Sequence, residues 1–248
     1  MFGSFFAVLK LYMVFIGLYC WSYKRLEDHN VSVYNNLIGT NRHTSLTIVI
    51  AHPDDEVMFF APTLLQLDNL MDSSIPFKVI CLTDGDSDGL GAIRRTELKK
   101  ALQVLVLNHR VVLEVGDLTD GMEIEWEKES VRTMLRGYIK DSNPLILTFD
   151  ERGVSGHKNH IACANAINDL AYKQLHLKTG KNILRKYSGF IVDLVRLLLG
   201  YPLDTVFIST ALQYLHSLVA MLVGHKSQMV WFRWGWWVLS RYVFANEY

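Results

Sequence analysis

A short apolar run that ends in a dense polar cluster is the feature of this chain that most constrains its fold. Residues 46–51, with the sequence LTIVIA, are apolar and rich in β-branched side chains, which predicts a short buried strand. The next five residues, HPDDE at 52–56, bring one imidazole and three carboxyl groups to the end of that strand. Open α/β sheets place their chemistry at this end. The cluster therefore predicts a functional site, with an acid-rich helix N-terminus as the alternative interpretation.

Further apolar runs of the same character follow, separated by stretches with helical spacing. Strands are expected at 77–82, 111–115 and 145–149. Helices are expected at 57–70, 126–139 and 157–172, and another after the turn-rich loop 84–91. Strands that alternate with helices form right-handed crossovers and a mostly parallel sheet. We therefore expect an α/β fold with a Rossmann-like, mostly parallel sheet flanked by helices.

A pair of histidines follows the run at 145–149. His157 and His160 open the helix expected there, and residues three apart share a helix face. Both imidazoles can therefore point toward the edge that carries His52 and Asp55. Two or three nitrogens and one carboxylate oxygen can hold a divalent metal and leave one position open for water. Asp54 would then be free to act as a base on that water.

The first 24 residues predict a membrane anchor. Residues 2–23 are apolar and aromatic apart from Lys10, and they are close to the ~20 residues that a membrane-spanning helix needs. Aromatic residues gather at the end of this run, and Lys24 and Arg25 follow, a pattern that places the rest of the chain in the cytosol. A cleavable signal peptide is the competing interpretation, weakened by the aromatic bulk where small residues should mark cleavage.

The rest of the chain divides into a polar linker at 25–45, a catalytic domain at 46–189 and an apolar helical C-terminal extension at 190–248. Within the extension, four tryptophans at 231–237 lie among basic residues and predict a segment at the membrane interface. The apolar run 206–223 contains polar residues, so it could pack against the catalytic domain or form a second membrane crossing.

Composition excludes some classes of function. The chain has 25 basic and 25 acidic residues among 248, so we expect no nucleic-acid partner. Its three cysteines, Cys20, Cys81 and Cys163, lie far apart and predict no disulfide framework, which suits a reducing compartment. The first strand is not followed by the G-x-G-x-x-G fingerprint of a dinucleotide site.

Three segments together resemble the PIG-L/LmbE-like deacetylases. They are AHPDDE at 51–56, the loop 84–91 followed by Arg94-x-x-Glu97-Leu98, and TFDERGVSGHKNH at 148–160. The stretches HKSQ at 225–228 and WFR at 231–233 resemble the eukaryotic branch, as does the N-terminal anchor. That branch consists of N-acetylglucosaminyl-phosphatidylinositol de-N-acetylases, which act in the second step of GPI-anchor biosynthesis. The resemblance covers nearly all of the chain from about Thr47 onward.

The resemblance implies a role for each matching residue. The family's zinc ligands match His52, Asp55 and His160. Its general base matches Asp54, and the histidine that stabilises the oxyanion or helps to protonate the leaving amine matches His157. Less closely defined substrate-binding positions match Arg94, Asp86, Asp88 and Ser155. Asn159 stands where some relatives carry Asp, and it can accept the same hydrogen bond without the charge.

The resemblance also implies the reaction and its setting. We expect a hydrolase that uses Zn²⁺, or another divalent metal, to remove the acetyl group from N-acetylglucosaminyl-phosphatidylinositol. Its expected partners are this glycolipid and the membrane bilayer, and its expected location is the endoplasmic reticulum membrane, with a single N-terminal anchor and a cytosolic catalytic domain. Two alternatives stay open: a deacetylase of another N-acetyl sugar conjugate, and a non-catalytic Rossmann-like scaffold, which should bind no zinc.

Overall fold

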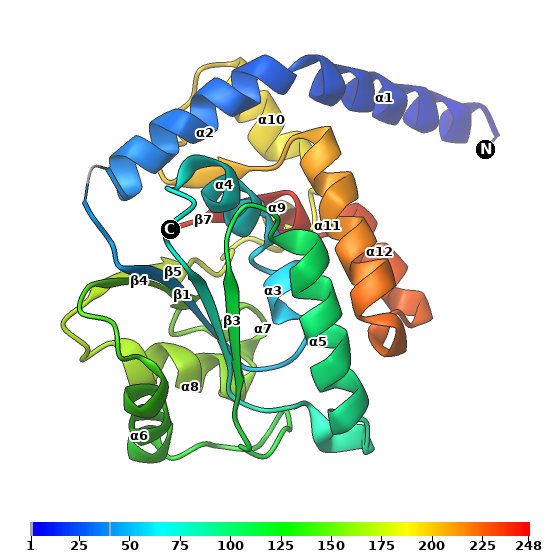
Figure 1. Ribbon diagram of the computed structural model, residues 1–248. Coiled ribbons are helices and arrows are strands. Elements are labelled where there is room, and N and C mark those ends of the chain that lie inside the picture. The colour runs from blue at the N-terminus through cyan, green and yellow to red at the C-terminus, as the bar shows by residue number, and fades with distance from the viewer. Residues whose placement is uncertain (1, 40) are drawn as a thin grey trace.

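A parallel sheet forms the centre of the computed structural model, which describes residues 2–39 and 41–248 (Figure 1). Among the described residues, five strands pair in the order β3-β2-β1-β4-β5, and every neighbouring pair is parallel. Their bounds are β1 Ser45–Ile50, β2 Phe77–Cys81, β3 Val111–Val115, β4 Pro144–Phe149 and β5 Lys173–Leu177. Strands β1 and β4 are buried along their whole length, as expected when helices cover both faces of a parallel sheet. The predicted α/β fold with a mostly parallel sheet is confirmed.

Helices cover both faces of this sheet. Two lie against one face, and three lie on the other, where α11 packs along α5 (Figure 1). The first group is α6 Lys128–Tyr138 and α8 Lys158–Ile167, and the second is α4 Ala61–Leu70, α5 Gly91–Leu105 and α11 Ala211–Gly224. Gly224 lets α11 approach α5 closely, because a Cβ at this position would lie 2.4 Å from the Cβ of Ala101. The apolar segment around 206–223 therefore packs against the catalytic domain.

Shorter elements complete the molecule. The antiparallel strands β6 Val206–Ile208 and β7 Ala245–Glu247 form a small second sheet, and the amide of Lys178 after β5 donates to the Glu247 carbonyl at 2.8 Å. The remaining short helices are α3 Asp55–Met58, α7 Gly153–Gly156, α9 Ile183–Lys186, α10 Ile191–Leu198 and α12 Trp231–Leu239. Single 3₁₀ turns are η1 Asp86–Asp88, η2 Lys226–Gln228 and η3 Arg241–Val243. The C-terminal residues thus belong to the same packed unit as the parallel sheet.

The segment expected as a linker is largely helical. Helix α2 runs over Tyr23–Leu37, and its residues Leu26, Asn30 and Val33 are buried on one face. The Asn30 side chain donates to the carbonyl of Ile208 at 2.7 Å and accepts from the amide of the same residue at 2.9 Å. These contacts fix α2 against β6, so this part of the chain is integral to the fold and does not act as a spacer.

The anchor predicted at 1–24 has no support in the structure. Within 2–39 and 41–248, no helix is both long enough and apolar enough to cross a bilayer. Helix α1 runs over Phe2–Trp21, and its first turns extend beyond the body of the molecule (Figure 1). Near its end, Tyr19 is buried, donates to the Ser209 carbonyl at 2.5 Å and stacks on Phe190 with ring centroids 4.7 Å apart. The last turns of α1 therefore pack on the protein itself.

Candidate active site

The carboxylate of Asp55 fixes the turn that follows β1. Its Oδ2 accepts hydrogen bonds from the backbone amides of Ala51 at 3.1 Å and His52 at 2.9 Å. Asp54 has a φ of 115°, a left-handed conformation that residues other than glycine rarely adopt. Its carbonyl accepts hydrogen bonds from two amides in α3, which begins directly after it. The turn thus gathers His52, Asp54 and Asp55 at the carboxyl edge of the sheet.

Two more histidines reach this edge from the loop after β4. His160 lies in the first turn of α8 and stacks flat on Phe149, with ring centroids 4.0 Å apart. His157 is the N-cap residue of α8, and its Nδ1 accepts from the Asn159 amide at 3.3 Å. Its ring centroid nevertheless lies 4.6 Å from that of His52 and 4.8 Å from that of His160. Three imidazoles therefore meet, although only one of them projects from the helix.

Three of the predicted residues face one another with their ligand atoms. His52 Nδ1 and His160 Nε2 lie 3.3 Å apart, and Asp55 Oδ1 lies 3.2 Å from His160 Nε2. All three side chains are buried, and one ligand atom from each lies within 4.8 Å of the others. Atoms bound at about 2.0–2.1 Å to a tetrahedral zinc ion are roughly 3.3 Å apart. The spacing of these three groups therefore fits such an ion.

The outer nitrogens of both imidazoles are occupied by acceptors. His160 Nδ1 donates to the Gly153 carbonyl at 3.1 Å, and His52 Nε2 lies 3.0 Å from Asp120 Oδ1 and 3.1 Å from Asn159 Oδ1. Carbonyl and carboxylate oxygens only accept, so the outer nitrogens carry the protons. The inner nitrogens can then offer lone pairs, as they do in metal-binding histidines. Two ring nitrogens and a carboxylate are directed at one point, so the donor set fits a divalent metal that takes the place of the inner proton of His52.

Asp120 is a site residue that the sequence analysis missed. It lies in the loop after β3 and contacts both His52 and Arg94. Burial lowers the pKa of His52, but hydrogen bonds to Asp120 and Asp55 outweigh this effect and raise that pKa to about 10. A metal bound to His52 must therefore displace a proton. Asp120 also supplies the charged acceptor that Asn159 lacks, and its place after a strand of the predicted sheet was the only signal for it.

The pKa of His157 lies well below the ordinary value of a histidine. Burial, followed by the positive charges of His52 and His160, lowers this pKa to about 4, so the ring is neutral at neutral pH. Because Nδ1 accepts from Asn159, the proton lies on Nε2, which can still donate to an oxyanion. His157 also forms a second possible ligand group with His52 and Asp120. That group would use His52 Nε2, which already donates to Asp120, so the group with Asp55 fits a metal better.

Two arginines lie beside Asp54. Arg233 of α12 donates from Nη2 to Asp54 Oδ2 at 3.0 Å, and Arg94 Nη2 lies 3.8 Å from the same oxygen. Arg94 also donates to the carbonyls of Pro53 at 2.8 Å and Gly85 at 2.9 Å, which joins the turn after β1 to the loop after β2. Arg233 was not predicted as a site residue, because it is 179 positions from Asp54 and no local pattern reveals the contact.

The other predicted substrate-binding residues lie apart from this cluster. Asp86 and Asp88 are exposed in η1, and the Asp86 carboxylate accepts from the Gly91 amide at 2.7 Å, which closes its own loop. Ser155 is exposed in α7. Within the described part of the chain, these three side chains make no contact with the three imidazoles. Their role in substrate binding stays a prediction.

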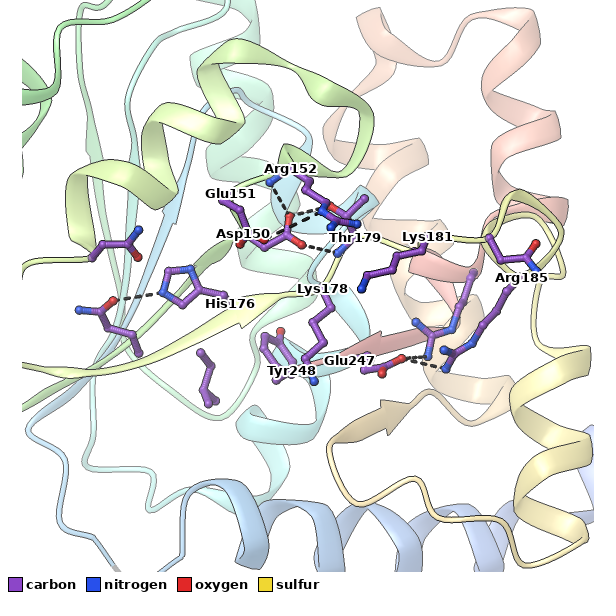
Figure 2. A pocket seen from close by; sticks show the side chains of 16 residues that line it. Asp150, Glu151, Arg152, His176, Lys178, Thr179, Lys181, Arg185, Glu247 and Tyr248 are labelled. Carbon is purple, nitrogen blue, oxygen red and sulfur yellow. Dashed lines mark hydrogen bonds and ion pairs between the residues drawn. The ribbon is translucent and has the colours of Figure 1, made fainter.

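A hollow of about 740 Å³ lies along the edge strand β5 (Figure 2). Asp150 accepts from the amide and the hydroxyl of Thr179, both at 2.6 Å, and Glu247 accepts from Arg185 at 2.8 Å and Arg241 at 3.2 Å. Several charged side chains that line the hollow are thus paired with one another or with neighbouring polar groups. Its lining contains none of the predicted metal-binding or catalytic residues.

The fold and the site together define a Rossmann-like α/β protein with a His–Asp–His group at the carboxyl edge of its sheet. Residues 47–171 match the family described as PIG-L, GlcNAc-PI de-N-acetylase. The N-acetylglucosaminyl-phosphatidylinositol de-N-acetylase of Saccharomyces cerevisiae is 34% identical over 97% of this chain and 93% of the relative, and that of Bos taurus is 34% identical over 81% of each. The chain therefore belongs to the PIG-L family of deacetylases.

A solved structure of another deacetylase is also similar to this chain. The N,N'-diacetylchitobiose deacetylase from Pyrococcus horikoshii is 19% identical, covers 75% of this chain and 80% of its own, and has a TM-score of 0.41.

Proposed function

We propose that this protein is a zinc-dependent N-acetylglucosaminyl-phosphatidylinositol de-N-acetylase. It would release acetate and glucosaminyl-phosphatidylinositol in the second step of GPI-anchor biosynthesis at the endoplasmic reticulum. The names of the yeast and bovine relatives support this substrate. The observation that carries the proposal is the pair of inward-facing nitrogens on His52 and His160, which meet the Asp55 carboxylate at a distance suited to one ion.

The residues that would hold the ion are His52, Asp55 and His160. When bound, zinc makes a water molecule acidic enough to supply a nucleophile near neutral pH and polarises the acetyl carbonyl. The donor set also suits other first-row divalent metals, because imidazole nitrogens and carboxylate oxygens bind several of these ions. Zinc is therefore the proposed ion, and metal analysis of the purified protein distinguishes it from the others.

The protein's own groups divide the proton transfers. Asp54 stands directly before the proposed ligand Asp55 in the turn after β1, and its carboxylate would accept the proton of the attacking water. His157 donates a hydrogen bond from Nε2 to the oxygen that becomes negative as the carbonyl is attacked, and one such donor is worth roughly 10²–10³ in rate. Asp54 then passes its proton to the departing amine. Arg94 and Arg233 pair with the Asp54 carboxylate and hold its orientation.

Acetate release from N-acetylglucosaminyl-phosphatidylinositol tests this function directly. The purified protein should release acetate, lose activity with a chelator and regain it with zinc. The Asp54→Asn variant should keep stoichiometric metal and lose about 10²–10⁴ of its turnover, because the amide cannot take the proton. A soluble N-acetylglucosamine conjugate serves as the comparison substrate. Equal turnover of both substrates would reject the lipid-linked assignment, and no acetate from either would reject the hydrolase.

We also propose that a bilayer surface binds the apolar helices at the C-terminal end of the chain. Four residues on one stripe of α11 are exposed, and so are three on one stripe of α12. The first stripe is Leu212, Leu215, Val219 and Val223, and the second is Trp231, Trp234 and Val238. Tyr214 joins the two helices by donating to the Trp237 carbonyl at 3.0 Å. Residues 205–246 include no acidic side chain, which suits an anionic lipid surface.

Vesicle co-sedimentation tests the membrane proposal. The protein should pellet with vesicles of phosphatidylcholine and phosphatidylinositol, and the double variant Trp231→Ser/Trp234→Ser should pellet much less, because two interfacial rings are lost. The matched control is Leu107→Ser/Met122→Ser, which removes two exposed apolar side chains outside both stripes. An equal loss of vesicle binding in both double variants would show that exposed apolar side chains in general, and not this surface, bind the lipid.

A further inference from the structure

The HKSQ turn at 225–228 is built into the back of the candidate active site. His225 is fully buried, and its Nε2 lies 2.5 Å from Oε1 of Glu56, which is also fully buried. Its other ring nitrogen, Nδ1, has no hydrogen-bond partner among the residues that the structure describes. The ring is therefore held through one contact, and that contact is with the last residue of the HPDDE cluster.

Glu56 connects this histidine to the proposed base. Its second oxygen, Oε2, accepts a hydrogen bond from the backbone amide of Asp54 at 3.1 Å. Asp54 is the residue with a φ of 115°, a strained conformation that persists only where its surroundings impose it. The hydrogen bond from the Asp54 amide to Glu56 therefore acts directly on this strained residue. The chain of contacts thus runs from His225 through Glu56 to the backbone of Asp54.

A second contact holds the same turn. The Glu97 carboxylate accepts from the amide of Ser227 at 2.8 Å and from its hydroxyl at 2.6 Å. Glu97 lies about one helical turn after Arg94 on α5, and Arg94 donates to the Pro53 carbonyl just before Asp54. The HKSQ turn is therefore fixed at two points, and the position of His225 does not depend on its bond to Glu56 alone.

Because Glu56 is buried, its carboxylate requires a hydrogen-bond partner, and His225 supplies one. A carboxylate with no exposed surface is costly unless it is paired and hydrogen-bonded. Burial lowers the pKa of His225, yet the neighbouring Glu56 outweighs this effect and leaves that pKa above its ordinary value. Without the imidazole, Oε1 of the buried Glu56 carboxylate would lose its partner, and the side chain would turn toward water, which weakens its hold on the Asp54 amide.

We infer that His225 and Glu56 are a positioning pair, which keeps Asp54 in its left-handed conformation and so sets the direction of its carboxylate. The inference rests on the proposed function and assigns a task to the C-terminal HKSQ segment in that reaction. The pair touches neither substrate nor metal. It acts through the backbone of Asp54, so its loss should lower kcat and leave KM and metal content unchanged.

Variants at His225 test the pair. His225→Leu removes the donor at similar volume, and it should lower kcat about 10–100-fold, the usual effect of losing a partner of this kind. His225→Gln keeps a donor near the position of Nε2 and should recover most of the loss. A crystal structure of His225→Leu should show Asp54 with a negative φ. Zinc content, KM and the unfolding midpoint are measured on every variant.

A second buried histidine–carboxylate pair provides the control. His109 Nδ1 lies 2.9 Å from Asp68 Oδ1, and both residues are buried at the opposite edge of the sheet, before β3 begins. His109→Leu should lower stability as His225→Leu does, but its kcat should stay near that of the wild type. An equal loss of kcat in the two variants would show that His225 is only structural, and loss of zinc from His225→Leu would also overturn the inference.

Glu56→Gln keeps the test decisive if His225→Leu does not fold. This variant keeps the shape and removes the charge that pairs with the imidazole, and it should also lower kcat at constant zinc content. Full activity of Glu56→Gln or His225→Leu overturns the positioning role. An inactive wild-type protein would instead reject the proposed function, so the two failures are distinguishable.

Discussion

At the scale of single residues, the orientation of His52 determines whether the site can bind a metal. One side of its ring faces the acceptors Asp120 and Asn159, and the other side faces His160. The contacts with the two acceptors therefore select the tautomer of His52. Asn159 is neutral, and Asp120 carries the charge. The metal site therefore depends on Asp120, a carboxylate outside the group formed by His52, Asp55 and His160.

Asp120→Ala should lower zinc affinity about 10–100-fold, because His52 loses its charged acceptor and its fixed tautomer. The measurement is a competition titration of metal-free protein against a chromogenic chelator. Asp117→Ala is the matched control, because Asp117 is exposed in the same loop and its loss should change nothing. Unchanged affinity in Asp120→Ala would mean that Asn159 alone orients the ring.

His157 gives the metal-free protein a dependence on acidic pH. Its pKa falls from 6.5 to about 4 on folding, first through burial and then through His52 and His160. The unfolded chain therefore binds this proton more readily, and stability is lost as pH falls from about 6.5 toward 4. Urea unfolding of metal-free protein should show a smaller loss over this window in His157→Gln. Identical pH profiles would show that the ring is not held in a neutral form.

At the scale of elements, α2 connects the N-terminal region to the small sheet. Leu26 is fully buried, and Leu26→Ala should lower the free energy of unfolding by about 2–5 kcal/mol through lost burial and a cavity. Val31→Ala on the exposed face of α2 should change it by less than about 0.5 kcal/mol. Chemical denaturation measures both. A small effect of Leu26→Ala would mean that α2 can detach without cost.

The elements that the sequence predicted well are those whose pattern is local. Strands β1, β2, β3 and β4 are mostly apolar runs, and their observed bounds differ from the predicted ones by at most one residue at each end. Strand β5 was missed because Lys173-Gln174-Leu175-His176-Leu177 is an edge strand with polar residues. The sequence of α2 predicts a linker because its buried face contains the polar Asn30, whose burial depends on β6.

The site divides in the same way. His52, Asp55 and His160 stand in short segments beside predicted strands, so the sequence located them, and the structure brings them together. Asp120, Glu56 and Arg233 act through contacts with residues whose place only the folded chain determines. His225 is 169 positions from Glu56, and pairs at such separation follow from packing and not from periodicity.

At the scale of the whole molecule, the metal group joins β1 to the loop and helix after β4. An ion bound there stabilises every element that positions its ligands, and the gain grows with its concentration. Zinc at about 100 times its dissociation constant should raise the Tm by about 5–10 °C for a chain of this size. Scanning calorimetry measures the shift, and His160→Ala should show none. An equal shift in both proteins would place the ion elsewhere.

The left-handed backbone at Asp54 has a consequence for laboratory evolution. Glycine has no Cβ and adopts this φ without strain, so Asp54→Gly relieves a local cost that the wild-type protein carries. A library screened only for heat resistance should therefore enrich glycine at position 54. Under the proposed role of Asp54, each of those clones would be inert, so a useful screen must reward product formation along with heat resistance.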